Sequence, residues 1–127
     1  IVDQRGARYD AEAHDMIGDV KDKTVIIVDD LIDTGSRIAS STKSVLAAGA
    51  KKVYVAATHA LLSQNATEVL NGLPVEQIVV TDTIKHKKYP DRMVRLSVAR
   101  LLAKGIDYIY NDKSIHRIFD EQNRIQG

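Results

Sequence analysis

Two adjacent carboxylates, Asp29 and Asp30, are followed by a short segment that we call the 33–37 loop: Asp33, Thr34, Gly35, Ser36 and Arg37. Adjacent carboxylates accept strong hydrogen bonds from hydroxyl groups and also bind metal ions. Backbone amides at the start of a helix favour anions, and a glycine there lets an anion approach closely. Two hydroxyls and a guanidinium add further donors. These residue types in this order indicate a site for a phosphorylated sugar.

The carboxylate pair follows an apolar segment that predicts a strand. Thr24 to Val28 is β-branched and almost wholly apolar, as expected of a strand buried on both faces of a parallel sheet. Further strands are predicted over residues 53–57, 77–80 and 93–96. Ligands of open α/β sheets bind at the carboxyl ends of the strands, which is where the pair and the 33–37 loop would lie.

Amphipathic segments alternate with the predicted strands, which indicates an α/β fold. Ile38, Val45 and Leu46 share one helical face, so a helix is predicted between the first two strands, with Gly49 as its C-cap. Two more helices are predicted, one over residues 66–70 and one from Ser97 onward.

The polar stretch 85–92 contains Pro90 and predicts a loop. Its basic cluster, Lys85 to Lys88, is expected to be a solvated loop, with contact to a nucleotide or a subunit as the alternative. His59 follows a strand, and we expect it to be a structural hydrogen-bonding residue at the ligand edge of the sheet.

Length and composition limit the class of protein. The 127 residues fit one compact domain, and the net charge of +1 argues against a dedicated nucleic-acid-binding module. The absence of cysteine excludes disulfides, a thiolate nucleophile and Cys-ligated zinc. The apolar runs are too short to span a membrane, and no signal peptide is visible. We therefore expect a cytoplasmic domain, and a start on Ile1 rather than Met indicates a fragment of a longer protein.

Two other interpretations fit part of the pattern. A strand that ends in an Asp pair also begins phosphoreceiver domains, where the pair binds magnesium. Asp82 would then be the acceptor, but nothing in a receiver requires the Asp-Thr-Gly sequence of the 33–37 loop. That tripeptide alone is also typical of an ordinary strand-to-helix turn, with Asp33 or Thr34 as the N-cap.

Residues 25–37 resemble the PRPP-binding motif of type I phosphoribosyltransferases, in which four apolar residues precede two acidic residues and a Thr-Gly loop. Other stretches are similar to ribose-phosphate pyrophosphokinases (PRPP synthetases): Gly18–Asp30, Ala48–His59, Val79–Ile84, Leu96–Ala103 and Ser114–Phe119. The resemblance implies a three-layer α/β domain with a mainly parallel sheet. It further implies that residues 18–127 are the C-terminal domain, that residues 1–17 end a catalytic-loop region, and that the N-terminal domain is absent from this chain.

The family transfers the diphosphoryl group of ATP to ribose 5-phosphate with Mg²⁺, giving PRPP and AMP. The resemblance implies that Asp29 and Asp30 contact the ribose hydroxyls and that Asp33, Thr34, Gly35, Ser36 and Arg37 hold the 5-phosphate. Arg5 would be a catalytic and substrate-binding residue, and no residue of this chain is expected to be a metal ligand. ATP and ribose 5-phosphate are the implied partners of a homo-oligomeric full-length enzyme, and the fragment alone is expected to be inactive.

This chain departs from the family pattern at three places. Arg5 matches the arginine of the catalytic loop, but Asp3 or Gln4 replaces its lysine. The 33–37 loop ends in Ser-Arg instead of a pair such as Gly-Thr, and Arg37 is expected either to contact the phosphate or to point outward. Of the serines associated with an allosteric phosphate site, Ser114 remains. A non-catalytic regulatory subunit and a nucleobase phosphoribosyltransferase therefore stay open as alternatives.

Overall fold

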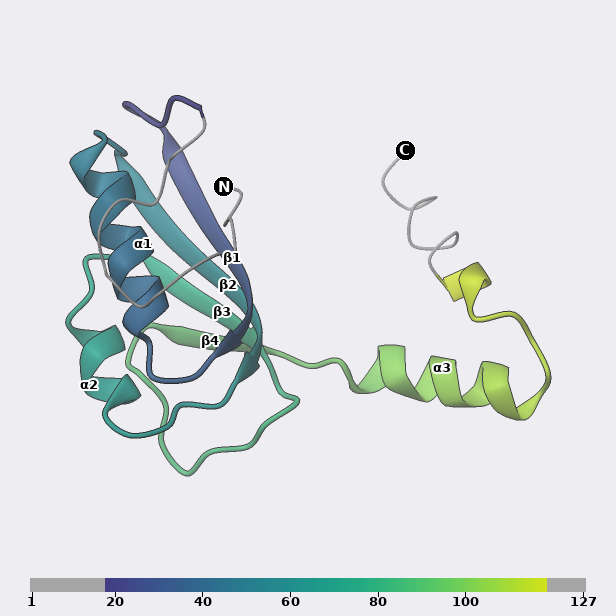
Figure 1. The fold of residues 1–127 in the computed structure, drawn as a ribbon. Coiled ribbons are helices and arrows are strands. Elements are labelled where there is room, and N and C mark those ends of the chain that lie inside the picture. The colour runs from purple at the N-terminus through teal and green to yellow at the C-terminus, as the bar shows by residue number, and fades with distance from the viewer. Residues whose placement is uncertain (1–17, 119–127) are drawn as a thin grey trace, which may run out of the picture. The chain divides into compact units, whose positions relative to one another are not determined.

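The computed structural model describes residues 18–118 (Figure 1). The elements are β1 (Thr24–Ile32), α1 (Ser36–Ala47), β2 (Lys52–Ala60), α2 (Ala66–Asn71), β3 (Gln77–Thr81), β4 (Met93–Leu96) and α3 (Ala99–Tyr110). The chain divides after Leu96 into two compact units, each of which is described by itself.

The four strands form one sheet in the order β1-β2-β3-β4, and all neighbouring strands are parallel. The register pairs Val25 with Val53 and Val55 with Ile78. The predicted α/β class and parallel sheet are confirmed. Because the strands run in one direction, the segments that follow them emerge at a single edge of the sheet.

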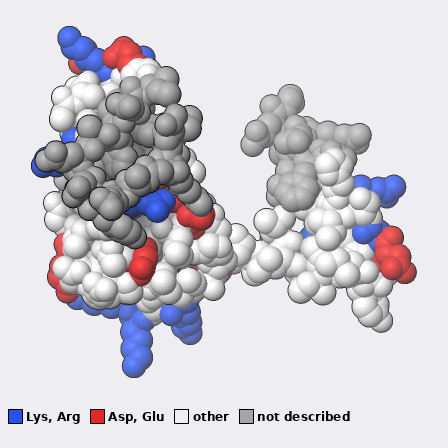
Figure 2. Space-filling view, viewed as in Figure 1, with Lys and Arg blue, Asp and Glu red and all other residues white. Residues whose placement is uncertain are grey.

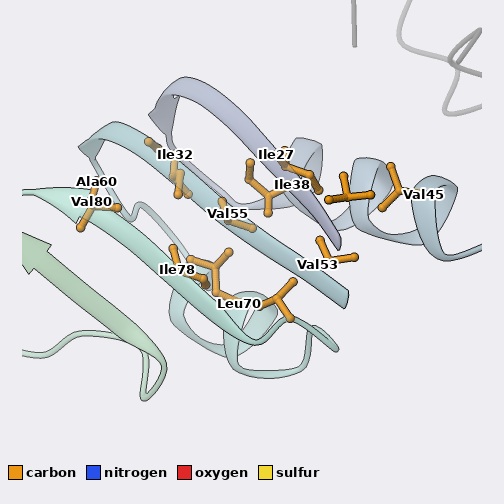
Figure 3. Packing of buried hydrophobic residues seen from close by; sticks show 13 residues of the cluster. Ile27, Ile32, Ile38, Val45, Val53, Val55, Ala60, Leu70, Ile78 and Val80 are labelled. Atoms are coloured by element: carbon orange, nitrogen blue, oxygen red, sulfur yellow. The ribbon is translucent and has the colours of Figure 1, made fainter. Parts of the chain in front are cut away.

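One face of the sheet carries the hydrophobic core. Alternate residues of the first three strands point into it, and Ile38 and Val45 of α1 and Leu70 of α2 pack against them (Figure 3). The inward strand residues are Val25, Ile27, Ile32, Val53, Val55, Ala57, Ala60, Ile78 and Val80. The inward residues of the strands, which recur at every second position apart from Ile32 and Ala60, pack against the apolar face of α1. This packing determines where α1 begins relative to β1.

The opposite face of β1 is open within residues 18–96. Ile26 is 61% exposed and Val28 is 77% exposed. Helices α1 and α2 both lie on the other side of the sheet (Figure 1). The prediction that Thr24 to Val28 is buried on both faces is therefore wrong for this unit, and a third layer would have to come from outside residues 18–96.

Two element boundaries matter for the site. The predicted strand ends at Val28, but β1 continues to Ile32, so Asp29 and Asp30 lie inside the strand. The ladder pairs Asp29 with Ala57 and continues after Asp30 with the pair Leu31 and His59. At the other end, α1 stops at Ala47 with Ala48 as its C-cap, so Gly49, predicted as the C-cap, follows one residue later; its φ is 91° and its N–H donates to Leu46 O at 2.9 Å.

The second unit contains α3, which confirms the helix predicted from Ser97 onward. Gly105 does not interrupt it, and Leu102, Ile106 and Ile109 are exposed. Among residues 18–118, no helix has the length and hydropathy needed to cross a membrane.

Candidate functional site

The candidate site lies at the carboxyl end of β1, where the sequence analysis places it. Asp29 and Asp30 lie on the last part of the strand, Asp33 to Gly35 turn away from the sheet, and Ser36 opens α1. The carboxylate pair and the start of a twelve-residue helix are thus joined by a turn of only a few residues.

The two adjacent carboxylates have different surroundings. The Asp29 side chain is only 14% exposed, and its Oδ1 accepts a hydrogen bond from the backbone N–H of Asp30 at 2.9 Å. Asp30 is exposed. A side-chain hydrogen bond shared with Asp29, followed by backbone hydrogen bonds and the charge of Arg37, holds the pKa of Asp30 below its ordinary value. Asp30 therefore presents an ionised acceptor to solvent at neutral pH.

Arg37 points back toward β1. Its Nη1 lies 3.7 Å from Asp29 Oδ1, and its side chain is 61% exposed. Arg37 was expected either to contact the phosphate or to point outward. In the structure its guanidinium pairs with a carboxylate and remains partly exposed to solvent. The ion pair connects the first turn of α1 with the carboxylate pair, so a cation stands between the two halves of the site.

The N-terminus of α1 has no side-chain cap. Its N-cap is Gly35, so the interpretation that Asp33 or Thr34 is the N-cap is wrong. The Thr34 and Ser36 hydroxyls lie 2.9 Å apart and hydrogen-bond to each other, and Thr34 Oγ1 accepts the Ser36 N–H at 3.4 Å. Among the described residues no side chain caps the helix, and Thr34 contacts its first amide only at 3.4 Å, so the first-turn amides and two hydroxyls form a surface suited to an anion.

Gly35 is required at its position by both backbone and packing. Its φ is 81°, in the left-handed region. A Cβ on this residue would lie 3.3 Å from Leu70 Cδ2 and 3.3 Å from Val69 Cγ1. Helix α2 thus packs directly behind the 33–37 loop and leaves room there for a glycine only.

A serine not predicted from the sequence, Ser63, contacts the loop. Ser63, in the connection from β2 to α2, donates its hydroxyl hydrogen to Asp33 Oδ1 and its backbone N–H to Asp33 O at 3.2 Å. The register of the two strands brings Ser63 to this place. Because Ile32 pairs with Ala60, the residues that follow β1 and those that follow β2 lie side by side.

The neighbouring part of the sheet edge is occupied by hydrogen-bonded side chains. His59 Nδ1 lies 2.9 Å from Thr83 Oγ1, as expected for a structural histidine at this edge. His86 Nε2 lies 2.7 Å from Ala60 O, so the 85–92 loop is attached to the end of β2. Lys85 and Lys87 are exposed, as predicted for a solvated loop.

Arg5, the expected catalytic residue, lies outside the described residues, as do the departures at Asp3 and Gln4. Within residues 18–118, no group of three His, Cys, Asp or Glu side chains could hold a metal ion. Figure 2 shows basic and acidic side chains interspersed on the visible face, as the net charge of +1 suggests.

Comparison with known proteins identifies relatives along most of the chain. Residues 10–120 match the family described as phosphoribosyl synthetase-associated domain. A ribose-phosphate pyrophosphokinase from Nostoc sp. is 43% identical over 123 residues, which cover 94% of this chain and 37% of that protein. One from Chlorobaculum tepidum is 37% identical over 125 residues, or 97% of this chain and 39% of that protein.

A solved structure shares the fold. The crystal structure of phosphoribosylpyrophosphate synthetase from Mycobacterium smegmatis aligns with a TM-score of 0.71 and 39% identity, covering 76% of this chain and 33% of that chain. The present chain therefore spans about two fifths or less of the length of these relatives.

Proposed function

The chain belongs to the ribose-phosphate pyrophosphokinase (PRPP synthetase) family, and from this premise we propose that it is the ribose 5-phosphate-binding half of such an enzyme. In this proposal the complete protein transfers diphosphate from ATP to ribose 5-phosphate. The observation that carries the proposal is the uncapped N-terminus of α1, which the Arg37–Asp29 ion pair joins to the carboxylate pair.

The carboxylate pair would bind the sugar ring. Two adjacent ring hydroxyls need two acceptors side by side, and hydrogen bonds to charged acceptors are short and strong. Asp30 is exposed and ionised, so it can accept a hydrogen bond from a hydroxyl of a sugar that arrives from solvent. Asp29 is held by the Asp30 amide and by Arg37, which orients its second oxygen in advance of binding.

The 33–37 loop would bind the 5-phosphate. The first-turn amides of α1 point toward the position of the anion, and the helix dipole favours negative charge there. Thr34 and Ser36 can exchange their mutual hydrogen bond for bonds to phosphate oxygens. Arg37, whose Nη1 lies 3.7 Å from Asp29 Oδ1, would share its donors between that carboxylate and a phosphate oxygen.

Mg²⁺ is part of the proposed reaction as the ion bound to ATP. Mg²⁺ in such sites is held by one or two carboxylates together with substrate phosphates and water. Within residues 18–118 there is no three-ligand cluster, and in this proposal Asp29 and Asp30 bind the sugar hydroxyls, so none of these residues is expected to be a ligand of the ion. The bound ion would neutralise charge on the transferring phosphates.

The contribution of this half to the reaction would be positioning. Diphosphoryl transfer depends on aligning the sugar hydroxyl with the ATP phosphorus and on charge neutralisation rather than on covalent chemistry with the protein. A sugar held at both ends, by carboxylates and by a helix N-terminus, has its reactive hydroxyl fixed in direction. In this proposal the ATP site and the subunit contacts belong to the rest of the full-length protein.

Isothermal titration calorimetry of the chain with ribose 5-phosphate tests the proposal. We expect binding by the parent, weaker binding of ribose, which lacks the phosphate, and loss of binding in the Asp29→Asn, Asp30→Asn double variant. Equal affinity of parent and double variant would show that the sugar site lies elsewhere. PRPP formation by the full-length protein then separates a catalytic subunit from a regulatory one.

A further inference from the structure

The connection between β2 and α2 is fastened to the end of β1. The amides of Leu61 and Leu62 both donate to Ile32 O, at 2.8 Å and 3.1 Å. The next amide, that of Ser63, donates to Asp33 O at 3.2 Å. Three consecutive amides thus hold the point where β1 becomes the 33–37 loop.

Ser63 also binds the side chain of the same aspartate. Its hydroxyl donates to Asp33 Oδ1, so one serine holds both the backbone and the carboxylate of Asp33. The residues on either side of it, Leu62 and Gln64, each have a φ of 53°. Residues other than glycine persist in this left-handed region only where their surroundings impose it, so the shape of the connection is determined by what it contacts.

The carboxylate that Ser63 holds is adjacent to an open anion site. Aspartate is among the preferred helix-capping residues, because its carboxylate accepts hydrogen bonds from first-turn amides. An unrestrained Asp33 carboxylate would compete with a phosphate for the amides of α1 and would repel it. In the structure, no side chain caps α1, and Asp33 Oδ1 is bonded to Ser63 instead.

We propose that Ser63 is a positioning residue that holds the Asp33 carboxylate away from the N-terminus of α1 and so keeps the amides available to a phosphate. This inference rests on the proposed function, since it takes the 33–37 loop to be the phosphate site. Ser63 would act entirely through Asp33 and would not contact the ligand.

Calorimetric titration with ribose 5-phosphate and, separately, with inorganic phosphate tests this role in five variants, counting Asp33→Ala alone. We expect Ser63→Ala to raise the Kd about ten- to a hundredfold, as loss of one hydrogen bond to a charged group would. Ser63→Thr keeps the hydroxyl and should restore binding. Ser44→Ala, which removes a half-buried serine hydroxyl elsewhere on α1, should bind as the parent does. In an Asp33→Ala background, Ser63→Ala should cause no further loss.

The outcomes separate the two proposals. A parental Kd in Ser63→Ala would overturn the positioning role, and so would an equal loss with and without the Asp33 side chain. If the parent binds inorganic phosphate with the expected Ser63 pattern but does not bind ribose 5-phosphate, the positioning role stands and the sugar function fails. If the parent binds neither, both proposals fail.

Discussion

Replacing Gly35 by alanine tests whether the 33–37 loop has the shape described above. An alanine at a φ of 81° pays the left-handed backbone cost, about 1–2 kcal/mol. Its Cβ would also lie 3.3 Å from atoms of Leu70 and Val69, and crowding of this kind costs about 1 kcal/mol or more. Leu70 is buried in the core, so a shift of its side chain would disturb the packing around it. The expected loss of stability is therefore roughly 2–4 kcal/mol.

Gly49→Ala is the matched control. Gly49 has a φ of 91°, but its nearest neighbour is the Lys21 side chain at 3.3 Å, which is flexible. Only the backbone cost, about 1–2 kcal/mol, should appear. Thermal unfolding followed by far-UV circular dichroism should show a drop of roughly 10 °C for Gly35→Ala and roughly 5 °C for Gly49→Ala.

The two glycine substitutions should also differ in their effect on ribose 5-phosphate binding. Gly35→Ala should weaken ribose 5-phosphate binding at least about tenfold, because the shifted loop no longer aims its amides at one point. Gly49→Ala should leave the Kd unchanged. Equal melting temperatures for the two variants would refute the packing argument, and an unchanged Kd in Gly35→Ala would refute the placement of the phosphate.

Four further predictions follow from the site. Asp29→Asn and Asp30→Asn, measured singly by calorimetry, should each leave the chain folded, and at least one should weaken ribose 5-phosphate binding several-fold. Arg37→Thr should weaken the same binding and flatten its dependence on salt; a variant that binds as tightly as the parent at both low and high salt would assign Arg37 to the surface. The pKa of Asp30 is lowered in the folded chain, so its ionised form stabilises the fold at pH values above the ordinary aspartate pKa. This contribution disappears as the pH falls through the lowered pKa. Asp30→Asn should therefore reduce the acid-induced decrease in melting temperature. The 127-residue chain alone should form no PRPP from ATP and ribose 5-phosphate above background, which an assay for PRPP would check.

Much of the fold could be predicted from the order of residue types. The β-branched runs mark β1, β2 and β3, and Gly49 marks the end of α1, because these signals depend on nearby residues only. The end of β1 was placed too early, since two aspartates in succession are typical of a turn. At the carboxyl edge of this sheet, however, the strand continues through the pair: Asp29 pairs with Ala57 and Leu31 with His59, while the Asp30 side chain between them is exposed.

The candidate site could be predicted only in part. Its chemistry resides in a contiguous stretch, so Asp29, Asp30 and the 33–37 loop are readable from the sequence. The contact between Ser63 and Asp33 joins residues 30 apart and depends on the register of two strands. The orientation of Arg37 toward Asp29 likewise depends on the direction in which α1 leaves the sheet, which the packing of Ile38 and Val45 determines.

A phosphate bound at the 33–37 loop would lie beside the carboxylates of Asp29 and Asp30 and would be repelled by them. A phosphate monoester carries about −1.5 to −2 charges at neutral pH, and two like charges about 4 Å apart repel by about 4 kcal/mol at the effective dielectric of a protein surface. A helix N-terminus supplies only about half a positive charge, too little to offset a phosphate beside two carboxylates. Arg37 adds a full charge 3.7 Å from Asp29, on the side where the carboxylate pair and α1 meet. Because this compensation comes from one exposed guanidinium, screening by salt should weaken it, and Arg37 is the residue whose loss should change the salt dependence of binding most.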